Sequence, residues 1–217
     1  MVIYIQNPNA FDAAPRYRAA TKTEGMGFMH LIQFEDDKGA RAVGATEGGV
    51  TTVVTGAGSV YALAAEAAER GLSLRAVVIE KGLGAKLDRE ALAREGRLLS
   101  PVDHPDPSHL YVTGTGLTHL GSASTRDAMH KSNQQQAEAP LTDSMKMFRM
   151  GLEGGKPAPG EIGVQPEWFY KGNGYTVAAP GQPIPSPAFA KDAGEEPEIA
   201  GIYYIGKDGT PFRLGFA

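Results

Sequence analysis

Alternating apolar and polar residues dominate the stretch from residue 29 to residue 54. Two turn-forming clusters, Asp36-Asp37-Lys38-Gly39 and Glu47-Gly48-Gly49, divide this stretch into three short runs. Such runs between turn residues are typical of β-strands joined by hairpins. The strands are expected at 29–35, 40–46 and 50–54. The pattern therefore predicts a three-stranded meander.

A helical period follows the meander. Apolar residues recur three or four positions apart after Ser59, which is a suitable N-cap, and Gly71 suits the C-terminal cap. A helix is therefore expected at 59–70. Residues 74–79 are predicted to form a short strand, and residues 88–96 a second helix. These elements predict a small α+β domain over residues 1–100.

The second half of the chain opens with a proline-rich connection. Pro101, Pro105 and Pro107 predict a rigid, extended linker, with His104 and His109 in solvent. A second domain is expected over residues 101–217. Its predicted strands are 110–113, 167–171, 175–178, 199–205 and 211–217, and its predicted helices are 124–138 and 142–152. The chain ends within an apolar strand, so we expect it to be truncated.

The composition is that of a globular protein and narrows the function. The net charge is −4 and no cluster of Lys and Arg is present, which argues against a nucleic-acid partner. The absence of cysteine excludes disulfides, thiolate metal sites and a cysteine nucleophile. No apolar run approaches the roughly 20 residues that span a membrane, and the N-terminus lacks a signal-peptide pattern. We therefore expect a cytoplasmic protein without a membrane partner.

Two acidic residues form the best candidate for a reactive site. Glu196 and Glu198 are separated by one residue, so in a strand both side chains point to the same face. Two like charges on one face repel unless a cation lies between them, and Mg²⁺ prefers carboxylate oxygens. The pair is therefore half of a possible Mg²⁺ or Mn²⁺ site. A solvated acidic strand start fits the same spacing and is the commoner case.

The histidines and glycine pairs add weaker signals. No two histidines have the i, i+4 spacing of a helical zinc site. His119 and His130 flank a polar segment, where either a solvated role or a general base beside a metal-bound water fits. Gly114-Thr115-Gly116 lacks the rest of a dinucleotide-binding fingerprint, so a tight turn is predicted there.

Four segments in the second half, taken in order, resemble the fumarylacetoacetate hydrolase (FAH) superfamily. They are nearest to its members that dehydrate 2-keto-3-deoxy sugar acids. The segments are Gly116-Leu117-Thr118-His119 with Arg126-Asp127-Ala128, then Pro166-Glu167-Trp168-Phe169-Tyr170-Lys171, Pro180-Gly181-Gln182-Pro183-Ile184 and Glu196-Pro197-Glu198-Ile199-Ala200. The resemblance covers roughly residues 101–217, and it favours the metal-site interpretation of the two glutamates.

The resemblance implies an α+β fold in which the small N-terminal domain precedes a mixed β-sandwich roll. It also implies Mg²⁺ (or Mn²⁺) acting as a Lewis acid on the 2-oxo group of a small substrate. The unpaired last strand suggests a homodimer or missing sheet partners. The residues that the resemblance assigns are the metal ligands Glu196 and Glu198, the catalytic residues His130 and Glu138, and the substrate-binding residues His119, Arg126 and Lys171.

The expected function is dehydration of a 2-keto-3-deoxy sugar acid of the arabinonate type. One alternative is C–C bond hydrolysis of acylpyruvate or similar diketo acids, because the resemblance implies the same metal site for both reactions. A further alternative is a non-catalytic binding protein that keeps the fold. Since the family's third ligand, an aspartate, and a catalytic lysine are expected beyond Ala217, these 217 residues alone are expected to show weak activity or none.

Overall fold

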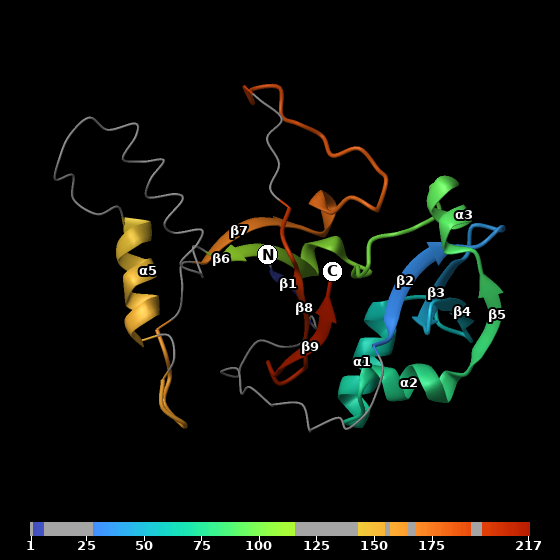
Figure 1. Ribbon diagram of the computed structural model, residues 1–217, viewed down its shortest axis with the longest axis horizontal. Helices are drawn as coiled ribbons and strands as arrows, with labels where there is room; N and C mark the ends of the chain where they lie inside the picture. Colours follow the sequence, from blue (N-terminus) through green and yellow to red (C-terminus); the bar gives the residue numbers. More distant parts are fainter. Residues whose placement is uncertain (1, 7–27, 116–142, 155–156, 165–167, 192–196) are drawn as a thin grey trace. The chain divides into compact units, whose positions relative to one another are not determined.

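The computed structural model describes residues 2–6, 28–115, 143–154, 157–164, 168–191 and 197–217 (Figure 1). These residues form a mixed α+β protein whose strands belong to two small sheets. The described helices are α1 (Val60–Arg70), α2 (Leu74–Lys81), α3 (Arg89–Arg94) and α5 (Asp143–Gly154). The strands are β1 (Val2–Gln6), β2 (His30–Glu35), β3 (Arg41–Glu47), β4 (Val50–Val54), β5 (Leu83–Leu87), β6 (Leu110–Thr115), β7 (Trp168–Asn173), β8 (Gly201–Ile205) and β9 (Pro211–Phe216). The α+β class is therefore confirmed.

The chain divides into two compact units. One comprises Met1–Val2 and Thr113–Lys171, and the other comprises Ile3–Val112 and Gly172–Ala217. Each unit is described by itself below. The predicted domain border at residue 100 is not tested by this division and stays a prediction.

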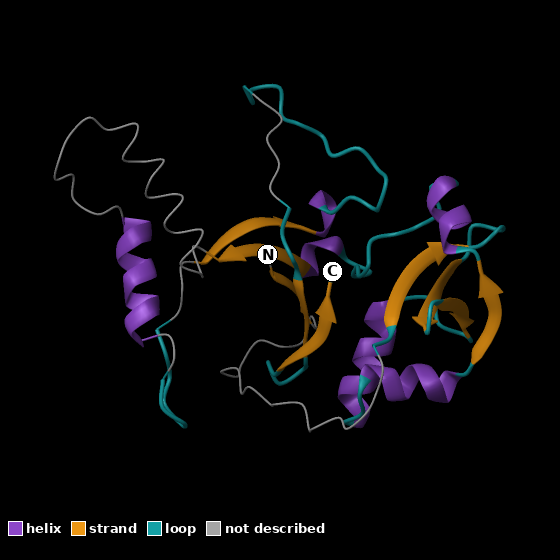
Figure 2. Ribbon diagram, in the orientation of Figure 1, coloured by secondary structure: helices purple, strands orange, loops and turns teal. Residues whose placement is uncertain are grey.

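The predicted meander is confirmed as part of a four-stranded antiparallel sheet. The strand order is β2-β3-β4-β5, and Figure 2 shows the strands beside the helices of the same unit. His30 lies opposite Thr46 in the β2–β3 pair, and Gly44 lies opposite Val53 in the β3–β4 pair. β5, which pairs with β4, was not predicted. Its Gly84-Ala85-Lys86 centre lacks the β-branched and aromatic residues that mark most strands.

Helix α1 forms as predicted because both of its ends are capped. The Ser59 hydroxyl accepts a hydrogen bond from the Ala62 N–H at 3.1 Å. Gly71 ends the helix with φ of 65°, a left-handed conformation that glycine adopts without a steric penalty. The apolar residues at helical spacing form the buried face of α1, namely Val60, Leu63, Ala64 and Ala67.

The strand predicted at 74–79 is wrong, because these residues form helix α2. The Ser73 hydroxyl caps this helix by accepting the Ala76 N–H at 3.1 Å. Val77 and Val78 are fully buried, and α2 contacts α1. Packing therefore overrides the weak helix propensity of the β-branched residues. The predicted helix at 88–96 is confirmed as α3, whose N-cap is Asp88.

The remaining strands form a five-stranded sheet in the order β7-β6-β1-β8-β9. β6, β7, β8 and β9 confirm four of the strands predicted in the second half, and α5 confirms the helix predicted at 142–152. The strand predicted at 175–178 is wrong. A 3₁₀ turn, Gly174–Thr176, stands there because the Asn173 side chain accepts the Tyr175 N–H at 3.1 Å. The helix predicted at 124–138 lies outside the described residues.

Candidate metal and substrate site

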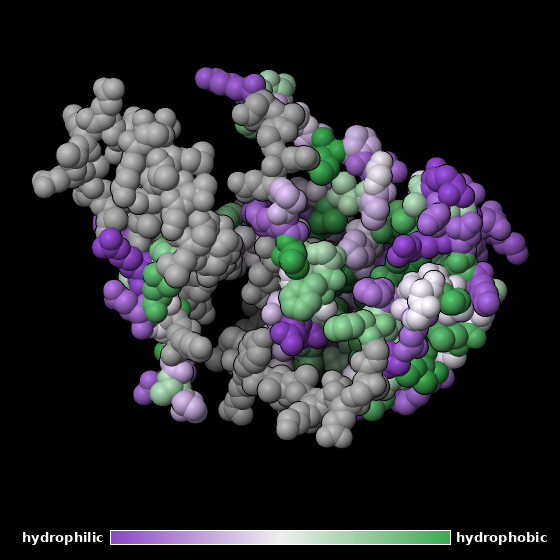
Figure 3. Space-filling model, viewed as in Figure 1, coloured by the Kyte–Doolittle hydropathy of each residue, from purple (hydrophilic) through white to green (hydrophobic). Residues whose placement is uncertain are grey.

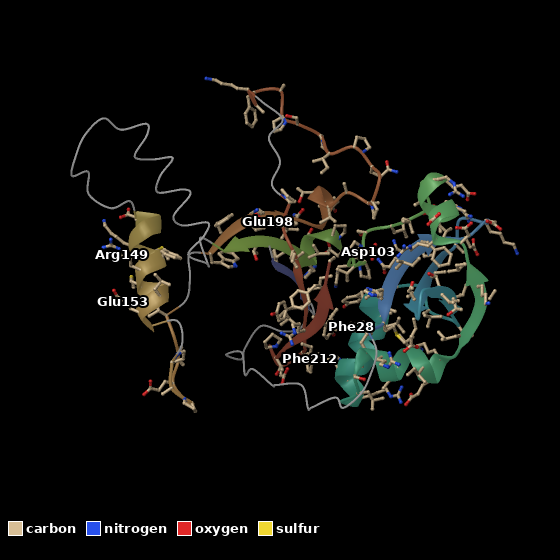
Figure 4. The ribbon with its side chains drawn as sticks, in the orientation of Figure 1. Phe28, Asp103, Arg149, Glu153, Glu198 and Phe212 are labelled. Atoms are coloured by element: carbon tan, nitrogen blue, oxygen red, sulfur yellow. The ribbon has the colours of Figure 1, made fainter. Side chains whose placement is uncertain are left out.

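Glu198 lies immediately before the β8–β9 hairpin and is exposed (Figure 4). The ladder of this hairpin extends beyond β8, because Ala200 and Ala217 exchange backbone hydrogen bonds of 2.8 and 3.0 Å. Along the strand, Ala200, Ile202 and Tyr204 are buried, whereas Ile199 is 76% exposed. Ala200, Ile202 and Tyr204 therefore share the buried face, because alternate residues of a strand point the same way, and Glu198 lies three residues before the first residue of β8.

The hairpin is fixed against helix α1 in the same unit. The ring of Tyr204, which is 1% exposed, lies 5.8 Å from the ring of Tyr61 on α1. In the turn of the hairpin, the Lys207 ammonium forms an ion pair with Glu69 of α1 at 2.6 Å, which raises the pKa of Lys207. These contacts support the hairpin that follows Glu198.

The donor chemistry of the predicted metal pair suits a hard divalent cation, since both side chains are carboxylates. Glu196 lies outside the described residues, so only Glu198 can be placed. Within the described part of the chain, no three His, Asp or Glu side chains gather in a way that could hold a metal ion. The part of the site that is described is therefore one exposed carboxylate on a supported hairpin.

Lys171 lies on β7, in the other compact unit. Its ammonium is 5.6 Å from the centre of the Phe169 ring, a distance at which a cation and an aromatic face attract. Both side chains lie against Gly114 of β6. A Cβ atom on Gly114 would be 2.4 Å from Phe169 Cζ and 2.9 Å from Lys171 Cε. A side chain at this position would therefore displace the Phe169 ring or the end of the Lys171 side chain.

The position of Gly114 inside β6 corrects the prediction of a tight turn at this glycine. The tight turn expected at Gly114-Thr115-Gly116 is wrong for its first two residues, because β6 continues through Thr115. The Gly116–His119 segment therefore begins where β6 ends. The other predicted site residues, His119, Arg126, His130 and Glu138, lie outside the described residues.

His104 is a buried polar residue that the sequence analysis placed wrongly in solvent. It is 9% exposed, and its ring meets the ring of Tyr61 edge-on with centroids 4.5 Å apart. The sequence around His104 gave no clear sign of burial, because its prolines suggested an exposed linker. His109, its neighbour, lies partly exposed and forms an ion-pair contact with Asp106 at 2.8 Å.

One open hollow of about 740 Å³ lies on the four-stranded sheet. It is lined by His30, Thr46, Gly49, Val50, Thr51, Lys86, Leu87, Asp88, Arg89 and Glu90. None of the predicted site residues is among them. On the face drawn in Figure 3, apolar residues reach the surface between polar ones. The hollow therefore gives no support to the predicted site.

The comparisons with known proteins leave the chain without an assigned family. No protein-family model, no curated protein and no solved structure matches it. In the part of the chain that the structure describes, no helix is long and apolar enough to cross a bilayer.

Proposed function

We propose that this chain is a divalent-metal-dependent enzyme of the FAH type that dehydrates a 2-keto-3-deoxy sugar acid, and that it acts as a homodimer. The observation that carries the proposal is the position of Glu198. The residue is exposed and lies immediately before a hairpin that is anchored on α1. A solvated acidic tail would require no such support.

The metal ligands in this proposal are Glu196 and Glu198. Their carboxylates would hold Mg²⁺ or Mn²⁺ at the start of the hairpin, where the remaining coordination positions stay open to substrate oxygens and water. When bound, the metal supplies Lewis-acid polarisation of the 2-oxo group. The protein's contribution at this point is the hairpin that follows Glu198, whose turn is tied to α1 by the Lys207–Glu69 ion pair.

Lys171 is the proposed partner of the substrate carboxylate. Its side chain is exposed and crosses Gly114, one residue before the end of β6. β6 leads directly into the segment that holds His119, and Arg126 follows in sequence. A lysine ammonium and a guanidinium both suit a carboxylate, since charge-assisted hydrogen bonds are stronger than neutral ones. His130 and Glu138 complete the proposal as the groups that move protons.

The test is a substrate comparison at fixed Mg²⁺. A 2-keto-3-deoxy pentonate and an acylpyruvate are supplied to the 217-residue chain and to the longest reading frame that contains it. We expect metal-dependent loss of the pentonate, with formation of a 2-oxo semialdehyde, and little hydrolysis of the acylpyruvate. Hydrolysis of the acylpyruvate alone would replace the dehydration with C–C bond cleavage. If neither substrate reacts in either protein, the proposed activity is wrong.

A matched pair of variants tests the role of Lys171. Lys171→Gln removes the ammonium, and Lys38→Gln does the same in the exposed β2–β3 turn of the other unit. Loss of one charge-assisted hydrogen bond is worth about 1.5–3 kcal/mol, so kcat/KM is expected to fall roughly tenfold to a hundredfold in the first variant. The second variant should keep wild-type activity. Equal kcat/KM in both would remove Lys171 from the substrate site.

A further inference from the structure

Residues 101–109, here named the clasp segment, are held against strand β3 and helix α1. Three consecutive residues make the contacts. Val102 is 1% exposed, Asp103 forms an ion pair with Arg41 of β3 at 2.6 Å, and His104 meets the Tyr61 ring of α1. Figure 4 labels Asp103 in this segment. The clasp segment is thus a docked part of the fold, and His104 is the titratable group at its buried contact.

The hydrogen bonds of His104 suit a neutral ring. Nδ1 lies 2.9 Å from the Asp106 backbone nitrogen and 2.8 Å from the Asp106 carbonyl oxygen, so it accepts the Asp106 N–H in one tautomer and donates to the carbonyl in the other. Nε2 is shielded from water and has no hydrogen-bond partner within the described residues. A neutral imidazole carries one N–H, whereas the imidazolium carries two. In the imidazolium, Nδ1–H can donate to the Asp106 carbonyl, but Nε2–H would be a buried donor on a cationic ring without a partner among the described residues.

The charged groups around His104 do not compensate for that loss. Asp103 is already paired with Arg41, and the Asp106 carboxylate contacts His109 and accepts the Ser108 N–H at 3.0 Å. The His109 ring lies 5.3 Å away and opposes a second positive charge. Burial is the largest influence and lowers the pKa of His104, although Asp106 and Asp103 act in the opposite direction.

The remaining neighbour, Tyr61, stays neutral across the physiological range. Burial raises the pKa of its hydroxyl, with smaller contributions from Tyr204 and Glu69. Tyr61 therefore offers no counter-charge to an imidazolium. The Asp106 carbonyl can accept one N–H of the ring, and the Asp103 and Asp106 carboxylates are committed to other partners, so burial remains the largest influence on His104.

We propose that the clasp segment is an acid-sensitive latch, in which protonation of His104 releases residues 101–109 from helix α1. The observation behind this is the juxtaposition of a buried histidine, an unpaired Nε2 and two carboxylates that are engaged elsewhere. In the closed latch His104 is neutral and buried against Tyr61. In the open latch its ring reaches water and takes up a proton.

The direction of the pH effect follows from proton uptake. A solvated histidine has a pKa of about 6.5. Above that pH, both forms of the latch are neutral at His104 and the closed form is fully favoured. As pH falls below about 6.5, the open form binds a proton that the closed form does not, so the open population rises by up to about tenfold per pH unit. The rise stops once the pH reaches the lower pKa of the closed form.

Hydrogen–deuterium exchange of the full chain tests the proposal. Exchange is followed in peptides covering residues 101–109 between about pH 8 and about pH 5, the range in which histidines titrate, with correction for intrinsic exchange rates. We expect the corrected opening of this segment to increase severalfold towards acid. His104→Phe keeps a ring against Tyr61 but cannot be protonated, so its opening should not depend on pH. His109→Phe, the matched control, should keep the dependence.

Two results would overturn the latch. One is a wild-type segment whose corrected exchange does not change over that range. The other is pH dependence that persists in His104→Phe and disappears in His109→Phe. If His104→Phe does not fold, NMR titration of the wild-type imidazole resonances decides instead. A His104 midpoint clearly below about 6.5 supports the latch, and a midpoint at or above that value contradicts it.

Discussion

Replacement of Gln33 by leucine is expected to destabilise the larger compact unit because it removes two side-chain hydrogen bonds. Gln33 lies on β2 and its side chain is fully buried. Its amide NH₂ donates to the Ser100 carbonyl at 2.8 Å, and its carbonyl oxygen accepts the N–H of Val60 at 2.7 Å. Val60 is the first residue of α1, where backbone N–H groups have no partner within the helix.

The size of the effect follows from the groups left behind. Leucine nearly matches glutamine in volume, so little cavity forms, but the Val60 N–H and the Ser100 carbonyl lose their partner. A buried polar group without a hydrogen bond costs about 1–3 kcal/mol. The buried Val60 N–H bears this cost in full, whereas Ser100 is half-buried and its carbonyl bears only part of it. The predicted loss is therefore roughly 2–4 kcal/mol, partly offset by the roughly 1 kcal/mol or more gained by burying an apolar side chain.

Equilibrium urea unfolding measures this loss, followed by fluorescence and circular dichroism. The matched control is Gln182→Leu, which makes the same change at an exposed position. We expect the control to stay within about 0.5 kcal/mol of wild type. The reasoning is refuted if Gln33→Leu unfolds at the same urea concentration as the control with an unchanged m-value, because the two buried hydrogen bonds would then contribute nothing.

Three further predictions concern single positions. Gly114→Ala places a Cβ within 2.5 Å of the Phe169 ring. Thermal unfolding should show that this variant loses about 1–3 kcal/mol of unfolding free energy, and that adding Phe169→Ala restores part of it. An uncompensated loss in the double variant would contradict the close approach. Ser59→Ala removes the cap of α1 and should cost about 1 kcal/mol in the same assay, whereas Ser59→Gly should cost only a few tenths. The Ala40 and Lys38 N–H groups donate to the Asp36 carboxylate and lower its pKa. The ionised carboxylate therefore stabilises the β2–β3 turn fully above the ordinary pKa of 3.8, and this stabilisation is lost as the pH falls through the lowered pKa. Carboxyl-carbon NMR should show this low midpoint, and a midpoint above 3.8 would rule it out.

Local patterns predicted the first sheet well, because each signal there agrees with its neighbours. Alternation, the Asp36–Gly39 turn and the Ser59 cap all operate over a few residues, and the structure reproduces them. β5 escaped prediction because nothing in residues 83–87 distinguishes a strand from a loop. Its conformation depends on pairing with β4, which is a long-range contact.

The wrong predictions also arise from contacts between residues that are far apart in the sequence. Val77 and Val78 indicated a strand, yet burial against neighbouring elements and the Ser73 cap made that segment a helix. His104 was expected in solvent because the surrounding prolines suggested a free linker, and only the fold reveals Tyr61 beside it. The site was predicted from motif order alone. Of its residues, Glu198 and Lys171 lie in the described part of the chain, each on or beside a strand of the five-stranded sheet.

The most direct test of the central proposal is calorimetric titration, with Mg²⁺ and with Mn²⁺, of the protein encoded by the longest reading frame that contains these 217 residues. Wild type is compared with Glu196→Gln/Glu198→Gln and with Glu161→Gln, an exposed acid outside the predicted site. The proposal predicts one metal ion per chain, unchanged in the Glu161 variant and lost in the double variant, with all three proteins folded by circular dichroism. No metal binding by the folded wild-type chain, or equal binding by the double variant, would return the two glutamates to a solvated strand start and contradict the proposed enzyme.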